Sequence, residues 1–256
     1  VLVDRKSFKN FTELFETMKS QIDKADYSVA WLDLASKGNP GRGILETANH
    51  QELDEGSQFS YETKPLLALP RCMPGGLLRP STIKKYNSLR FLLADKEKSL
   101  KENELSAFMH PLDKVRNWNR LYGKTGVIQW QVAVPEVSEH VLFDIIDSIH
   151  KEEAPAFLVV LKKLGPANQA PLSFPMEGWT LAVDFPAKHQ EIHDCLDALD
   201  QEIVNVGGRI YLAKDARLNP DLIPKMYPRI DEWKSIRQNI DPNNRWQSDF
   251  SRRLDL

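Results

Sequence analysis

The stretch from 127 to 214 constrains the fold most, because strand and helix patterns follow one another there in an order that few architectures accommodate. Alternating or short apolar runs typical of strands occupy residues 127–134, 156–163, 179–185 and 209–214. Apolar residues at the spacing of a helix occupy 138–149 and 189–206. This β-α-β-β-α-β order predicts an α+β fold of ferredoxin-like elements, with a mostly antiparallel sheet and helices packed on one face.

The remainder of the chain gives a weaker pattern. Ser7 is a candidate N-cap for a helix to about residue 25, and the alternation from Tyr27 to Leu34 predicts a strand. Between 46 and 107, proline, glycine and charged residues interrupt the pattern, so we expect an irregular excursion of loops and short helices. No internal repeat is visible, and one domain over residues 1–256 is the prediction.

Charge and cysteine content exclude several classes of protein. Lys and Arg number 34 against 36 Asp and Glu, a balance that argues against a nucleic-acid partner. No apolar run approaches the roughly 20 residues that span a bilayer. Two cysteines, Cys72 and Cys195, form neither a disulfide framework nor a four-ligand metal site, and we expect no metal. The first residue is not Met, which we interpret as a fragment or a processed product.

Strand alternation also identifies candidate ligand contacts. Gln129 and Gln131 share the face of their strand opposite to its large apolar residues. That face is either solvated or a hydrogen-bonding platform for a polar ligand, since paired amides offer both donors and acceptors.

Two lysines are the next candidates. Lys162 falls on the parity of Leu158 and Val160, so it is either a strand end that reaches water or a cation for an anionic ligand. Lys214 closes the strand that begins at Arg209, where a local ion pair with Asp215 is the simpler interpretation. The sequence contains none of the nucleophile-elbow, zinc-protease, Walker or dinucleotide motifs, so residue patterns alone leave the chemistry unnamed.

Several segments taken together carry a family resemblance. They occupy 108–113, 117–123, 128–132, 165–176, 178–186, 207–215 and 226–229. The most specific is Gly-Pro-Ala-Asn-Gln-Ala-Pro-Leu-Ser-Phe-Pro at 165–175. In collinear order, this series resembles the C-terminal half of FAD-linked oxidases of the vanillyl-alcohol-oxidase and aldonolactone-oxidase type.

The resemblance implies that residues 1–256 are a substrate or cap domain, and that an N-terminal domain of the same protein binds FAD. The full-length enzyme would oxidise a secondary hydroxyl of a sugar or of a lipid-phosphate-linked pentose, with hydride transfer to the flavin, whereas the fragment alone would be inactive. A polyprenyl-phosphate sugar as substrate, a reductase for the keto product and self-association of the fragment follow as expected partners. The implied location is cytoplasmic, with peripheral contact at the inner membrane left open. The alternative is a stand-alone ligand-binding or protein-interaction domain without flavin.

Matching positions give candidate roles. The resemblance implies catalytic roles for Lys214 and Tyr211, and places Lys214 and Ala213 beside the flavin. It places four further residues on the substrate side, namely Gln129, Gln131, Lys162 and Thr180. Thr180 stands where the family has asparagine, and Ala182 where some relatives have cysteine, so the substrate is less constrained than the reaction class.

Overall fold

The computed structural model describes residues 1–36, 38, 40–52, 61, 65–71, 78–96, 100–187 and 190–256. The chain forms two compact units. The first unit comprises residues 1–127, 155–160 and 186–188, and the second comprises 128–154, 161–185 and 189–256. Among the described residues, no helix has both the length and the apolar character needed to span a bilayer.

The first unit follows a β-α-β-β-α-β order. Its main elements are β1 (Leu2–Phe8), α1 (Phe11–Gln21), β2 (Tyr27–Asp33), β3 (Arg42–Asn49), α2 (Pro80–Lys96) and β5 (Leu100–Glu102). Its short elements are η1 (Ile22–Lys24), β4 (Leu67–Ala68), α3 (Leu105–Met109), η2 (Pro111–Lys114), β6 (Val115–Arg116) and η3 (Trp118–Thr125). The strands lie side by side in the order β2-β3-β1-β5, and every neighbouring pair is antiparallel.

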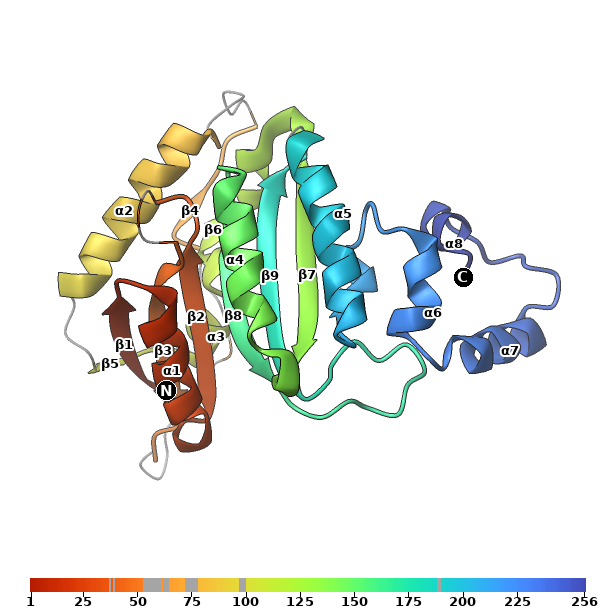
Figure 1. The fold of residues 1–256 in the computed structure, drawn as a ribbon. Coiled ribbons are helices and arrows are strands. Elements are labelled where there is room, and N and C mark those ends of the chain that lie inside the picture. Colours follow the sequence, from red (N-terminus) through yellow and green to blue (C-terminus); the bar gives the residue numbers. More distant parts are fainter. Residues whose placement is uncertain are drawn as a thin grey trace. The chain divides into compact units, whose positions relative to one another are not determined.

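The second unit repeats that order with different residues (Figure 1). Its elements are β7 (Val127–Pro135), η4 (Glu136–Ser138), α4 (Val141–Lys151), β8 (Val159–Leu164), β9 (Gly178–Pro186), α5 (Gln190–Asn205) and β10 (Arg209–Ile210). At the strand ends, Val127, Val159, Val160 and Pro186 fall in the first unit. The strands lie in the order β8-β9-β7-β10. After β10 the chain continues through η5 (Leu212–Lys214), η6 (Pro220–Leu222), α6 (Ile223–Met226), α7 (Ile230–Ile240) and α8 (Asp249–Leu254).

Alternation along β7 and β9 places the core of the second unit. Trp130 on β7 and Trp179 on β9 are buried, as are the other apolar residues of the same parity on each strand. Buried apolar residues of α4 and α5, including Ile145 and Leu196, cover this face, and Figure 1 shows both helices on one side of the strands. The opposite parity carries the polar side chains.

In the first unit, the helices do not all pack on one face of the strands, as the sequence had predicted. Trp31 and Ile44 are paired across β2 and β3, and they form a buried cluster with Ala94 of α2. The neighbouring parity faces α1 instead, because a Cβ on Gly43 would lie 2.7 Å from the side chain of Leu14. The α+β class and the mostly antiparallel sheets are confirmed, but α1 and α2 pack on opposite faces of the first sheet.

Three expectations about individual elements were wrong. The stretch 46–107 contains α2, a helix of 17 residues, and β5, which pairs with β1. Residues expected to start the first helix belong to β1, and Asn10 is the N-cap, since its side chain accepts from the Glu13 N–H. The strand expected over 209–214 ends at Ile210 and turns into η5.

The chain forms two compact units, whose strands follow the same 2-3-1-4 order when counted within each unit. This repeated topology was not visible as a repeat in the sequence, because the corresponding elements share a period of apolar residues rather than residue identities. The single substrate domain expected over 1–256 stays a prediction. Cys72 lies outside the described residues.

Candidate active site

A group of polar side chains lies on the face of β7, β8 and β9 that points away from α4 and α5, and we call it the polar face. Its members are Gln129, Gln131, Lys162, Thr180 and Asp184. Gln131 Nε2 donates to Thr180 Oγ1 at 2.9 Å, and Gln129 Nε2 donates to Asp184 Oδ1 at 2.6 Å. The two glutamines predicted from alternation therefore hold fixed orientations, each through a bond to the neighbouring strand.

Asp184 is the polar-face residue to which sequence reasoning gave no role. It is 1 % exposed and Thr180 is 4 % exposed, so both are buried although they point away from the helices. A buried carboxylate needs hydrogen bonds or a nearby cation. The signal in the sequence was a carboxylate inside the apolar run 179–185, on the same parity as Thr180.

Lys214 belongs electrostatically to the same group. Burial lowers the pKa of Lys214, the Asp184 carboxylate acts to raise it, and the charge of Lys162 lowers it further. The two predicted lysines therefore lie close enough to repel each other, with Asp184 as the compensating charge. Two lysines beside one carboxylate leave an uncompensated positive charge, which would favour an anionic group.

Tyr211 and Ala213 precede Lys214 on the chain. The Tyr211 N–H donates to the Gln131 carbonyl at 2.8 Å, and its ring centroid lies 4.4 Å from that of Phe174. Lys214 Nζ lies 5.9 Å from the Tyr211 ring centroid. All the predicted site residues thus lie within the second unit.

An apolar cavity of about 370 Å³ adjoins these residues. Phe174, Tyr211 and Tyr227 line it together with Ala213. Phe174 belongs to the specific run at 165–175, which is held in place from outside because Arg209 donates to the Ser173 carbonyl and Arg229 to the Gln169 carbonyl. The run therefore forms one wall beside Tyr211.

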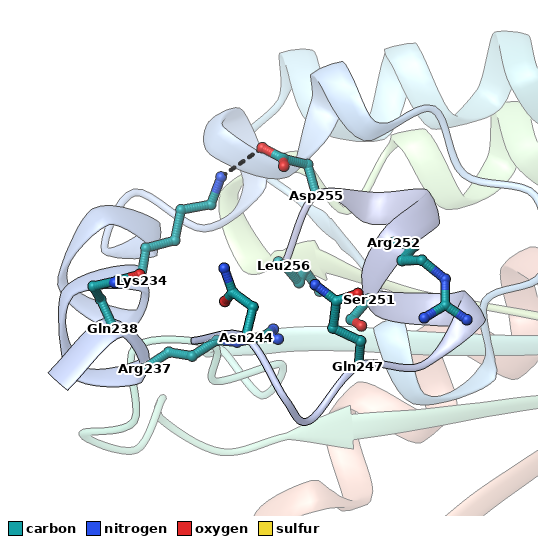
Figure 2. A pocket seen from close by; sticks show the side chains of 9 residues that line it. All are labelled: Lys234, Arg237, Gln238, Asn244, Gln247, Ser251, Arg252, Asp255 and Leu256. Atoms are coloured by element: carbon teal, nitrogen blue, oxygen red, sulfur yellow. Dashed lines mark hydrogen bonds and ion pairs between the residues drawn. The ribbon is translucent and has the colours of Figure 1, made fainter. Parts of the chain in front are cut away.

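A second cavity, of about 440 Å³, lies between α7 and α8 (Figure 2). Its cations are already engaged, since Lys234 pairs with Asp255 at 2.8 Å and Arg252 with Asp249 at 2.5 Å. Arg237 donates to the Trp246 carbonyl at 2.8 Å. Paired charges at an exposed surface favour solvation over ligand binding, so the polar face remains the candidate site.

Comparison with known proteins identifies relatives of this chain. The family model for D-arabinono-1,4-lactone oxidase matches residues 136–254, which include Lys162, Thr180 and the segment from Tyr211 to Lys214. Decaprenylphosphoryl-beta-D-ribose oxidase of Mycolicibacterium smegmatis is 38 % identical over 237 residues, covering 90 % of this chain and 51 % of the relative. An uncharacterized Streptomyces coelicolor protein from the mprA 5' region is 30 % identical over 263 residues, covering 96 % of this chain and 71 % of the relative.

The chain belongs to the D-arabinono-1,4-lactone oxidase family. It spans about half the length of the mycolicibacterial oxidase. The family match begins beyond Gln129 and Gln131, so these two residues enter the site through their contacts with Thr180 and Asp184, which lie inside the matched range. Membership thus coincides with the resemblance found in the sequence, while the role of each site residue is a separate question.

Proposed function

We propose that this chain is the substrate-side domain of an FAD-dependent oxidase that oxidises a secondary hydroxyl of a sugar or of a lipid-phosphate-linked pentose. The observation that carries the proposal is the convergence of Lys214, Lys162 and Asp184 with two oriented glutamines in one unit of a family member. An FAD-binding domain, N-terminal in the same protein, would complete the enzyme.

The residues present fit a flavin. FAD, when bound, supplies the acceptor for the hydride that leaves the alcohol carbon. Lys214 and the main chain at Ala213 would hold its ring, because a partly desolvated cation favours the negative charge that reduction adds. Gln131 Oε1 is buried and has no hydrogen-bond partner among the described residues, which leaves an acceptor available within the site.

The substrate roles follow from side-chain chemistry. Gln129, Gln131 and Thr180 would orient sugar hydroxyls, since amide and hydroxyl groups both donate and accept. Lys162 would meet a phosphate as an exposed cation. Tyr211 would contribute a hydroxyl next to Lys214. The proposal includes a reductase that consumes the keto product, a cytoplasmic location and peripheral contact with the inner membrane.

The test uses the full-length gene product, with flavin absorbance as the readout. Under anaerobic conditions, sugars, aldonolactones and lipid-phosphate pentoses are offered, and bleaching of the flavin is followed. Lys214→Met should slow bleaching by on the order of a hundredfold while FAD content stays unchanged. Lys225→Met, which removes an exposed lysine of α6, should have no effect.

Two results would overturn the proposal. One is a full-length protein that holds FAD but is bleached by none of these substrates. The other is a gene product that binds no FAD at all, which would favour the alternative of a stand-alone ligand-binding or interaction domain. Gel filtration of the 256-residue chain tests the expected self-association separately.

A further inference from the structure

The segment that carries Lys214 is connected to β7 at its beginning. The chain leaves β10 at Ile210, which pairs with Val132, and the Tyr211 N–H then donates to the Gln131 carbonyl at 2.8 Å. Three residues later comes Lys214, whose own N–H donates to the Tyr211 carbonyl at 3.1 Å. This connection joins Lys214 to the strand that bears both glutamines.

A second connection reaches the same strand from the other end of the segment. Arg217 Nη2 lies 2.6 Å from Asp200 Oδ2, and the Trp130 indole N–H donates to Asp200 Oδ1 at 2.8 Å. Trp130 stands on β7 between Gln129 and Gln131. The side chains of Arg217 and Asp200 are only 9 % and 3 % exposed, so this ion pair is buried beneath the strand.

Asp215 makes the segment between the two connections stiff. Its Oδ1 accepts from the N–H groups of Arg217 at 3.0 Å and Leu218 at 2.8 Å. Its Oδ2 pairs with Arg253 of α8 at 2.5 Å. Because these bonds fix the turn after Lys214, a displacement of Arg217 is transmitted toward Lys214 rather than absorbed by the loop.

We propose that Arg217 and Asp200 are positioning residues that fix Lys214 relative to Gln129 and Gln131, an inference that rests on the proposed function of Lys214. A buried ion pair is a weak source of stability, since apolar residues of similar volume often serve as well or better. Positioning of Lys214 relative to the strand that bears both glutamines would explain why this buried pair is ionic, where stability would not. Trp130 takes part because its indole N–H orients the carboxylate.

The experiment compares three variants of the full-length protein. Arg217→Met breaks the buried pair and also the exposed contact with Asp197. The double variant Asp200→Leu/Arg217→Met removes both charges of the buried pair and is the variant to use if the single one does not fold, because it leaves no unpaired charge at Asp200. Arg252→Met is the matched control, because it removes an arginine from an exposed pair with Asp249. Circular dichroism and thermal unfolding establish which variants are folded.

The main readout is the pH dependence of Lys214 acetylation by acetic anhydride, measured by peptide mass spectrometry. In the parent protein, burial keeps the pKa of Lys214 below its ordinary value. Loss of the connection should let water reach the amine, so the midpoint should rise by about half a pH unit or more in the double variant. The midpoints of other lysines, and of Lys214 in Arg252→Met, should stay unchanged.

Flavin bleaching is the second readout. If Lys214 is displaced, bleaching should slow by on the order of tenfold to a hundredfold with the same FAD content. A folded double variant whose Lys214 midpoint equals that of the parent would overturn the positioning role, whatever the flavin does. A shifted midpoint in a protein whose flavin is never bleached would uphold the positioning role and overturn the proposed function.

Discussion

At the residue scale, Asp200 should make stability depend on pH. Burial raises the pKa of Asp200 to about 6, against the opposing pull of the Arg217 charge and the Trp130 hydrogen bond. Since the folded state holds this proton more tightly than the unfolded state, the contribution is present below the ordinary aspartate pKa and is lost as pH rises through about 6. The loss amounts to about 3 kcal/mol at most.

Asp200→Asn should therefore flatten this part of the profile, because asparagine does not titrate while it still accepts from Trp130. Urea unfolding of parent and variant at intervals from pH 4 to pH 7 measures the difference. The charges of Asp197 and Asp215 act on Asp200 and both carboxylates are present in parent and variant, so only the difference between the two profiles reports on Asp200. Parallel profiles would contradict the prediction.

The backbone at Gly178 leaves no room for a side chain. Its φ is +152°, and an added Cβ would lie 2.1 Å from the Val134 carbonyl oxygen and 2.9 Å from the Glu136 nitrogen. Gly178→Ala should lower the free energy of unfolding by about 3 kcal/mol or more, because backbone rather than a flexible side chain must move. Gly165→Ala is the control, with nothing within 4 Å of the added Cβ, and should change stability by less than about 0.5 kcal/mol.

At the element scale, the contact between β7 and β9 sets the orientation of a predicted substrate residue. Thr180→Val removes the acceptor of the Gln131 amide and leaves that amide buried without its bond, which should cost about 1 to 2 kcal/mol. Adding Gln131→Met should recover most of the loss, since both polar partners are then gone. A double-mutant cycle in urea gives the coupling energy, and additive effects would rule out the contact.

The elements predicted correctly from the sequence are those whose buried apolar residues recur at one regular spacing, that of a helix or that of a strand. Ile145 and Leu196 lie on helices with one apolar side, and Trp130 lies on a strand with one apolar face, so α4, α5 and β7 followed from spacing. Helix α2 was not predicted, because its apolar residues do not all lie on one side. Leu89 is 57 % exposed and Leu92 is 56 % exposed, so apolar residues occupy its outer side as well. No single period then distinguishes it from a loop.

The site was predictable in part for the same reason. Alternation placed Gln129 and Gln131 on one face, but their partners depend on how β7 and β9 are aligned. The alternation within one strand does not determine its register with a neighbouring strand. Asp184 and the pair of Asp200 with Arg217 became visible only when separate elements came together. Their roles remain predictions, as do those of Lys214 and Tyr211.

At the scale of the whole molecule, the net charge of −2 does not describe the candidate site, which contains two lysines, Lys162 and Lys214. At Lys214 the charge of Lys162 and the carboxylate of Asp184 act in opposite directions. Such a site favours an anionic ligand within a nearly neutral protein, because local potential rather than total charge governs binding in a confined site. Recognition of an anion, as proposed for this site, does not require the basic composition of a nucleic-acid-binding protein.

Also at the scale of the whole molecule, we expect most of the affinity for FAD to lie outside this chain. The chain has no G-x-G-x-x-G motif, and its contacts to a flavin would be limited to the region of Ala213 and Lys214. We therefore expect the 256-residue chain, purified with added FAD, to elute with substoichiometric flavin, and the full-length gene product to retain one FAD per chain. Absorbance at the flavin band against protein concentration measures both.

Lys214→Met provides the control for that comparison. In the full-length protein it should leave FAD content unchanged while bleaching slows, because one lysine contributes little to the total binding of a large cofactor. Stoichiometric FAD on the 256-residue chain would contradict this division, since it would mean that this chain contains a flavin site of its own. Loss of that FAD in Lys214→Met would then locate the site on the polar face.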